Sequence, residues 1–215
     1  MEITKIILEF IKVTIWPITI FIILLIFQNQ IGDLFHRIKK AELPGGINIE
    51  TFPEQLQLAK EISKEVKKES LAKNAENKKP IINLTDANKR MISLGLAPSP
   101  SGLDMSYYRN LSKQDPNIAF AGLRMEIDLM IKNLAKGFKI EISDSDSTDD
   151  KLRKLRDNDA ITDNQFDLIK KLIKLCNNAI HGLKVTDEDA NAILDIGTVL
   201  RDDYIAWLSW GFNDN

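Results

Sequence analysis

The residues best suited to chemistry lie in one short stretch, Cys176-Asn177-Asn178-Ala179-Ile180-His181. Asn177 and His181 are four residues apart, so on a helix they share one face. A histidine there would be available as a general base, although an Asn–His pair at a helix end also suits plain capping. Cys176 lies on the apolar face of the same helix and has no base near it in sequence, which favours a buried, inert thiol over a nucleophile.

Three helices are predicted to position this stretch. A capping box and a terminal glycine bound a helix over 162–182. An Asp-Pro start predicts an earlier helix over 115–137, and a capped acidic first turn predicts a later one over 186–208. Their apolar positions recur at helical spacing: Ala119, Leu123, Ile127, Phe166, Ile169, Leu172, Ile193, Ile196 and Leu200. Long helices with short connections indicate an antiparallel helical bundle and an all-α fold class.

The stretches DPNIAFAGLRMEIDLMI and LIKLCNNAIHG, within residues 115–210, resemble the HEPN superfamily. More narrowly, they resemble its bacterial membrane-associated branch of uncharacterised domains. The resemblance implies a helical bundle that usually dimerises, and it implies a place among prokaryotic defence or stress proteins. Nuclease members carry arginine, a polar residue and then histidine at the end of one helix, and they cleave RNA without metal across the dimer interface. On this resemblance the polar residue corresponds to Asn177 and the histidine to His181.

The arginine position of that motif holds Cys176 in this chain. Cleavage of RNA by its 2′-hydroxyl needs a base, here His181, and a cation for the negative charge that develops on the phosphorane. A neutral thiol cannot replace a guanidinium, and a missing arginine costs on the order of 10³–10⁵ in rate in other phosphoryl-transfer enzymes. Lys174, seven residues before the histidine, is a candidate substitute cation.

A separate stretch, Val13 to Phe27, holds fifteen uncharged residues, VTIWPITIFIILLIF. As a helix it would reach about 22 Å, short of a hydrocarbon core of ~30 Å, so Ile6–Ile11 or Gln28–Ile31 must supply the rest. Its N-terminal position and the basic flank that follows favour a membrane anchor. A buried soluble helix and a cleaved signal peptide are the alternatives, but the second lacks the small residues that a cleavage site needs.

The basic residues around this stretch predict its orientation. Arg37, Lys39 and Lys40 follow it, whereas Lys5 and Lys12 precede it. Under the positive-inside rule, the C-terminal side lies in the cytoplasm of a single-pass inner (plasma) membrane protein. The single cysteine of the chain suits a reducing compartment.

Four regions are expected along the chain. Residues 1–32 form the membrane anchor, and 33–73 form a basic juxtamembrane segment with a short turn and strand, then a solvated helix or stalk. Residues 74–114 form a linker with short helices, and 115–215 form the helical bundle. On this division, we expect residues 103–215 to fold without the anchor.

No cofactor or metal site is expected. The acidic run SDSDSTDD lacks the glycine and the final glutamate of an EF-hand loop, so it is interpreted as a solvated, helix-capping loop.

Charge limits the partners. Residues 1–114 carry 16 Lys and Arg against 12 Asp and Glu, a net charge of +4, and residues 115–215 carry 13 against 19, a net charge of −6. An acidic bundle disfavours general nucleic-acid binding, so RNA is not the favoured partner. The expected partners are the lipid bilayer, a second copy of the chain in a homodimer, and another protein. The sequence therefore favours a membrane-anchored interaction or regulatory module, with a weak or conditional ribonuclease and a passive scaffold as alternatives.

Overall fold

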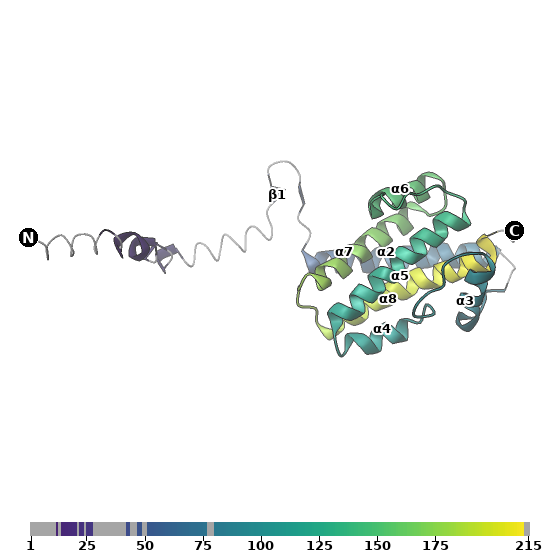
Figure 1. Ribbon diagram of the computed structural model, residues 1–215, viewed down its shortest axis with the longest axis horizontal. Coiled ribbons are helices and arrows are strands. Elements are labelled where there is room, and N and C mark those ends of the chain that lie inside the picture. The colour runs from purple at the N-terminus through teal and green to yellow at the C-terminus, as the bar shows by residue number, and fades with distance from the viewer. Residues whose placement is uncertain are drawn as a thin grey trace, which may run out of the picture. The chain divides into compact units, whose positions relative to one another are not determined.

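The chain divides into two compact units, Met1–Thr51 and Phe52–Asn215. A computed structural model describes residues 12, 14–20, 22, 23, 25–27, 42, 43, 47, 48, 51–76 and 80–212. Within them the regular structure is helical apart from one pair of two-residue strands (Figure 1). The predicted all-α fold class is confirmed at this level.

The first unit contains a helix and a strand pair. Residues 14–27 are helical wherever the structure describes them. None of the helices in the described part of the chain is both long and apolar enough to cross a membrane. Parts of the predicted span and its flanks lie outside the described residues: Val13, Phe21, Leu24, 1–11 and 28–41, which include the orienting Arg37, Lys39 and Lys40. Strand β1 (Glu42–Leu43) pairs antiparallel with β2 (Ile47–Asn48).

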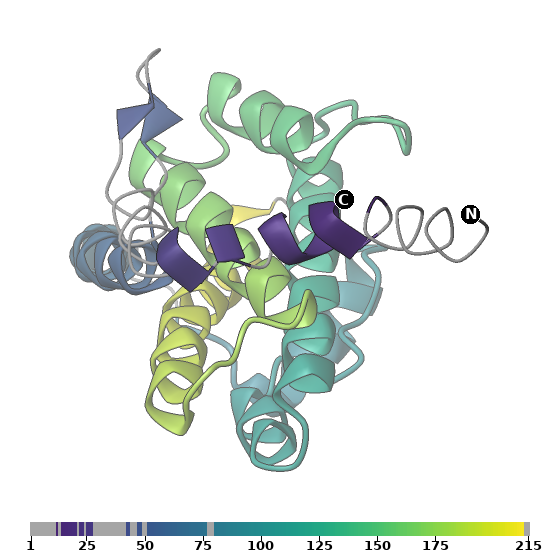
Figure 2. The same ribbon diagram turned by 90° about the vertical axis from the view of Figure 1, so that its left-hand side faces the viewer.

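The second unit is a bundle of helices. Its elements are α2 (Phe52–Glu76), α3 (Leu84–Ser93), α4 (Met105–Ser112), α5 (Pro116–Gly137), α6 (Thr148–Asp157), α7 (Asp163–Ile180), α8 (Asp187–Ala206) and the π-helical turn η1 (Trp207–Gly211). Helix α7 packs against both α5 and α2, and α8 packs against α2 and α4. Figure 2 looks along α2, in blue, and shows it beside α7 and α8.

The predicted helix starts are confirmed at α5, α7 and α8. The Asp115 side chain accepts hydrogen bonds from the first backbone N–H groups of α5. Thr162 and Gln165 form a reciprocal capping box at α7, and Thr186 and Asp189 form another at α8. Each cap satisfies backbone donors that have no partner inside the helix. The predicted apolar faces meet in the core, where these side chains are wholly or almost wholly buried: Ala119, Leu123, Ile127, Ile169, Leu172, Ile193, Ile196 and Leu200. Phe120, Leu168 and Leu194, which were not predicted, are fully buried with them.

Helix α2 is part of the bundle, so its interpretation as a solvated helix or stalk is wrong. Leu56, Ala59 and Val66 are buried against α7 and α8. Near the start of α2, the Asn178 amide of α7 donates to Gln55 Oε1 at 3.1 Å. A narrow apolar stripe on a helix is compatible with a stalk and with a bundle. Here the stripe of α2 packs on the sides of α7 and α8 that would otherwise be exposed to water.

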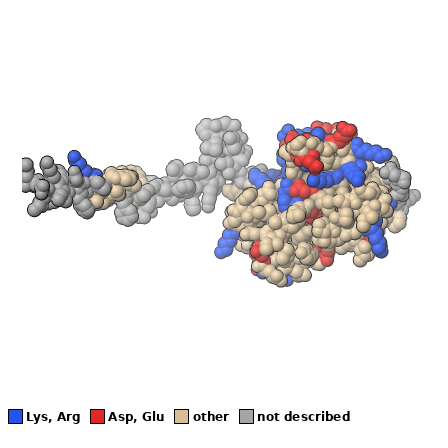
Figure 3. All heavy atoms as spheres, in the orientation of Figure 1, with Lys and Arg blue, Asp and Glu red and all other residues tan. Residues whose placement is uncertain are grey.

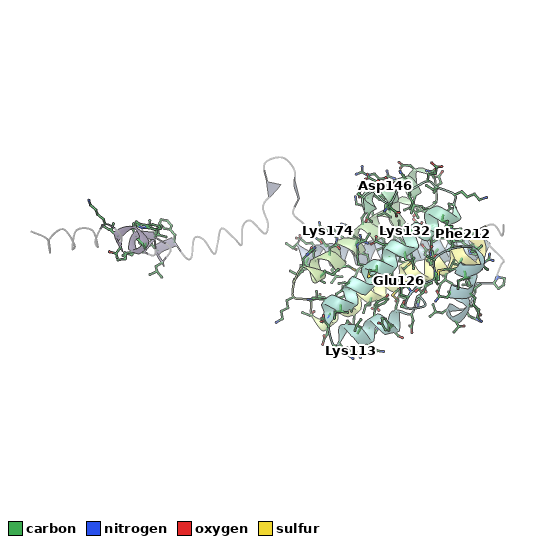
Figure 4. The ribbon with its side chains drawn as sticks, viewed as in Figure 1. Lys113, Glu126, Lys132, Asp146, Lys174 and Phe212 are labelled. Carbon is green, nitrogen blue, oxygen red and sulfur yellow. The ribbon has the colours of Figure 1, made fainter. Side chains whose placement is uncertain are left out.

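The expected linker over 74–114 is also structured, except that 77–79 lie outside the described residues. The Asn133 amide of α5 both accepts from the backbone N–H of Ala97 at 3.0 Å and donates to its carbonyl at 2.8 Å. The Tyr108 hydroxyl of α4 donates to Glu126 Oε2 at 2.8 Å, and Ser101 donates to the same oxygen at 2.9 Å. Glu126, labelled in Figure 4, is fully buried on α5. These polar contacts attach the segment to the bundle, so the compact unit begins at Phe52 and not at Asp115.

Candidate functional site

The end of α7 carries the residues that sequence reasoning selected. The helix stops at His181, whose backbone N–H donates to the Asn177 carbonyl at 2.9 Å. Gly182 follows with a φ of +90°, a conformation that suits glycine and ends the helix. The His181 side chain is exposed and Asn177 is half-buried one turn earlier. The two residues therefore lie close together at the helix end, as their spacing predicted.

Cys176 is buried without exposed area. Burial raises the pKa of its thiol to about 12, although the nearby Arg124 guanidinium acts in the opposite direction. A thiol with this pKa is protonated at neutral pH, and the thiolate is the reactive form. The predicted burial of the cysteine is confirmed.

Lys174, the candidate substitute cation, is exposed on α7 (Figure 4). It already takes part in an interaction within the chain. Sequence reasoning missed a second cation, Arg124 of α5, which influences Cys176 from the neighbouring helix. Its Nη2 donates to Thr148 Oγ1 at 3.0 Å, and its Nη1 forms an ion pair with Asp128 that lacks hydrogen-bond geometry. A lone arginine among the apolar residues of FAGLRMEIDLM was the signal in the sequence.

A second feature of the bundle is a groove of about 1380 Å³ between α2 and α8, which the sequence did not predict. The two helices run in the same direction. Asn74, near the end of α2, accepts a hydrogen bond from the Trp210 indole just beyond α8 at 3.1 Å. At the other end, Gln55 contacts the end of α7, shortly before α8 begins. We call this feature the α2–α8 groove.

The floor of the α2–α8 groove is apolar. Ile196 and Ile205 are almost fully buried at its base, and Val199 is half-buried beside them. Towards the end of α2, Leu71 is 60% exposed and Ile81 is 51% exposed. Large apolar side chains are therefore open to solvent at one end of a concave surface.

The rims of the α2–α8 groove carry opposite charges. Lys60, Lys64 and Lys67 line the α2 rim, and none of them has a side-chain partner among the described residues. The α8 rim carries Glu188, Asp195 and Asp202. Arg109 Nη2 lies 2.7 Å from Asp195 Oδ1, and Arg201 Nε lies 2.7 Å from Asp202 Oδ1. Arginines of the same chain thus partly neutralise the acidic rim, whereas no acidic side chain of the described residues neutralises the basic rim.

A smaller hollow of about 540 Å³ lies between the end of α5 and α6. Lys132, Lys136 and Lys154 line it, but each is already engaged. Lys154 Nζ lies 2.7 Å from Asp146, Lys132 Nζ lies 3.5 Å from Asp144, and Lys136 donates to a backbone carbonyl. In Figure 3, charged side chains of both signs gather over this region around α6. Its lysines are largely neutralised and suit an anion poorly.

Comparison with known proteins found one family that resembles part of this bundle. Residues 107–204 match the model of a family described as a domain of unknown function, DUF4145. No curated protein and no solved structure matches the chain. The match runs from α4 to α8, so it includes Arg124, Cys176 and His181 and one rim of the α2–α8 groove. Helix α2, which supplies the basic rim, lies outside it. Just under half of the chain is therefore similar to the DUF4145 family.

Proposed function

We propose that this protein is a membrane-anchored, non-catalytic interaction or regulatory module whose bundle lies in the cytoplasm. The observation that carries the proposal is the state of Cys176. It occupies the place where a HEPN-like nuclease would need arginine, and its side chain is a fully buried thiol with a pKa of about 12. Such a group supplies neither a cation nor a nucleophile. The α2–α8 groove does not include the end of α7, where Asn177 and His181 lie.

The surface of the N-terminal helix supports the anchor. Ile15, Trp16 and Ile18 are 56–62% exposed although they point to three different sides of a helix. Ile26 and Phe27 continue the pattern. A helix that is apolar on every side needs a lipid or protein environment. The resemblance stated above further implies a homodimer and a role in prokaryotic defence or stress, and both are part of the proposal.

Two measurements test the anchor and its orientation. The full chain should stay with membranes after an alkaline carbonate wash, whereas a 52–215 fragment should be released. Alkaline phosphatase fused after Asn215 should be inactive because the fusion stays in the cytoplasm. A full chain that the wash removes, or an active fusion, would contradict the proposal.

A cleavage assay tests the non-catalytic part. We expect wild type to leave labelled single-stranded RNA intact, as should His181→Ala. The matched control is His36→Ala, because His36 is the other histidine of the chain. Cleavage by wild type and by His36→Ala that is lost in His181→Ala would reject the non-catalytic function. Cys176→Arg asks whether a guanidinium restores cleavage, with a melting curve to show that the bundle tolerates a buried charge.

The alternative function is a weak or conditional metal-independent ribonuclease. One observation favours it, namely that the Arg124 guanidinium acts electrostatically on Cys176 from a different helix. With His181 as base and Asn177 beside it, Arg124 would take the part of the missing cation once released from Asp128. Under this alternative, Arg124→Lys and His181→Ala would each abolish cleavage while keeping the wild-type melting temperature.

A further inference from the structure

We propose that the α2–α8 groove binds an amphipathic helix of a partner protein, with acidic residues along the edge that faces α2. This inference deepens the proposed function and rests on it, because it says what an interaction module would bind and where. It uses three properties of the groove: its shape, its apolar floor and its charged rims.

Shape and floor indicate a helical occupant. Small-molecule pockets occupy about 300–1,000 Å³, and the α2–α8 groove, at about 1380 Å³, is larger. Glu188 and Asp202 lie fourteen residues apart on α8, so the acidic rim runs about 21 Å, the length of a four-turn helix. An amphipathic helix lays its apolar stripe into such a trough. Here Val199 and the exposed Leu71 and Ile81 would receive that stripe.

The rims set the charge of the occupant. Lys60, Lys64 and Lys67 are spaced four and three residues apart, so they form one row along α2. Their positive charge has no partner among the described residues. Across the groove, Arg109 and Arg201 already pair with two of the three acidic side chains. The bound helix should therefore carry acidic residues on the edge that faces α2. Basic residues are favoured, more weakly, on its edge that faces α8.

The same charges argue against nucleic acid. A phosphate backbone carries negative charge along its whole length, and an occupant of this width would meet the carboxylates of Glu188, Asp195 and Asp202. A second copy of the chain is the remaining rival, since it would offer both signs of charge. Both rivals are outcomes of the test below.

The probe is a labelled fifteen-residue helical peptide with a leucine stripe, glutamates along one edge and lysines along the other. A comparison peptide carries lysines along both edges. Binding is measured by fluorescence anisotropy to the full chain in zwitterionic lipid nanodiscs, and empty nanodiscs supply the blank. The test variant is Lys60→Glu/Lys64→Glu/Lys67→Glu. The matched control, Lys113→Glu/Lys139→Glu/Lys184→Glu, makes the same charge change at exposed lysines outside the groove.

We expect wild type and the control to prefer the glutamate-edged peptide. Reversal of the α2 rim should weaken that peptide about tenfold and strengthen the all-lysine peptide by a similar factor, because three charges at the rim change sign. A reversal of preference is informative because an unfolded variant would bind neither peptide. Equal affinities in wild type and the rim variant would overturn the proposal.

Two further results would also overturn it. If labelled RNA binds wild type and the rim variant loses that binding, the groove is a nucleic-acid site. If sedimentation shows that the rim reversal alone dissociates a wild-type dimer, the occupant is a second copy. These results are separable from a failure of the proposed function. If the carbonate wash removes the chain from membranes, the same titration is run on the full chain in solution, where the peptide preference should be unchanged. The appearance of RNA cleavage would also leave that preference unchanged, and a failed peptide test would leave attachment unchanged.

Discussion

Removal of residues 52–102, which hold α2 and α3, should unfold the bundle, and the loss of α2 alone is large enough to do so. The informative comparison is between a 52–215 fragment and a 103–215 fragment, which keeps the five helices α4 to α8. Leu56, Ala59 and Val66 are 4%, 0% and 0% exposed on α2. Burial of the Leu56 and Val66 side chains is worth about 1.5–3 kcal/mol each, and the side chains of α7 and α8 that they cover lose a similar amount when α2 is gone. The total is about 6–12 kcal/mol, which equals most of the 5–15 kcal/mol that stabilises a typical domain.

Circular dichroism and urea titration would measure this loss. The 52–215 fragment should be soluble and melt in one cooperative transition. The 103–215 fragment should show no cooperative transition and should bind a hydrophobic dye, as expanded states with loose packing do. If 103–215 melts cooperatively within a few degrees of 52–215, α2 contributes little and the unit begins later in the chain than the structure indicates.

Three smaller predictions follow from buried polar groups. Cys176 should resist a thiol reagent at pH 8 in the folded protein and react after unfolding in urea, because its pKa is raised to about 12; fast native labelling would contradict its burial. Burial raises the pKa of Asp203, so the folded state holds its proton to higher pH than the unfolded state, and stability from this group should fall as pH rises from about 3.8 to the raised value. Asp203→Asn, which still accepts from Gln165, should flatten that fall in urea titrations between pH 4 and 7, and an unchanged slope would reject the assignment. Tyr108→Phe should lower the free energy of unfolding by about 1–3 kcal/mol, because it leaves Glu126 one donor short, and a neutral effect would contradict the bond.

Local signals in the sequence determined where the main helices begin and which faces are apolar. Asp115, the Thr162–Gln165 box and the Thr186–Asp189 box each act over three or fewer residues. A cap depends on the chain immediately around it, so its outcome can be predicted without knowledge of the fold. The burial of Cys176 was predicted for a similar reason, because the residue lies on the apolar stripe of its helix.

Only the tertiary structure showed which helices pack against one another. The apolar stripe on α2 was visible in the sequence, but its spacing does not indicate which helix packs against it. The expected stalk was therefore wrong. Its partners lie far away in the chain: Gln55 meets Asn178 across 123 positions, and Asn74 meets Trp210 across 136. The α2–α8 groove and the electrostatic effect of Arg124 on Cys176 arise in the same way, from elements that come together only when distant helices pack. Sequence periodicity reports which side of a helix avoids water, whereas the choice of the covering helix depends on shape and charge complementarity between segments that only the folded chain brings together.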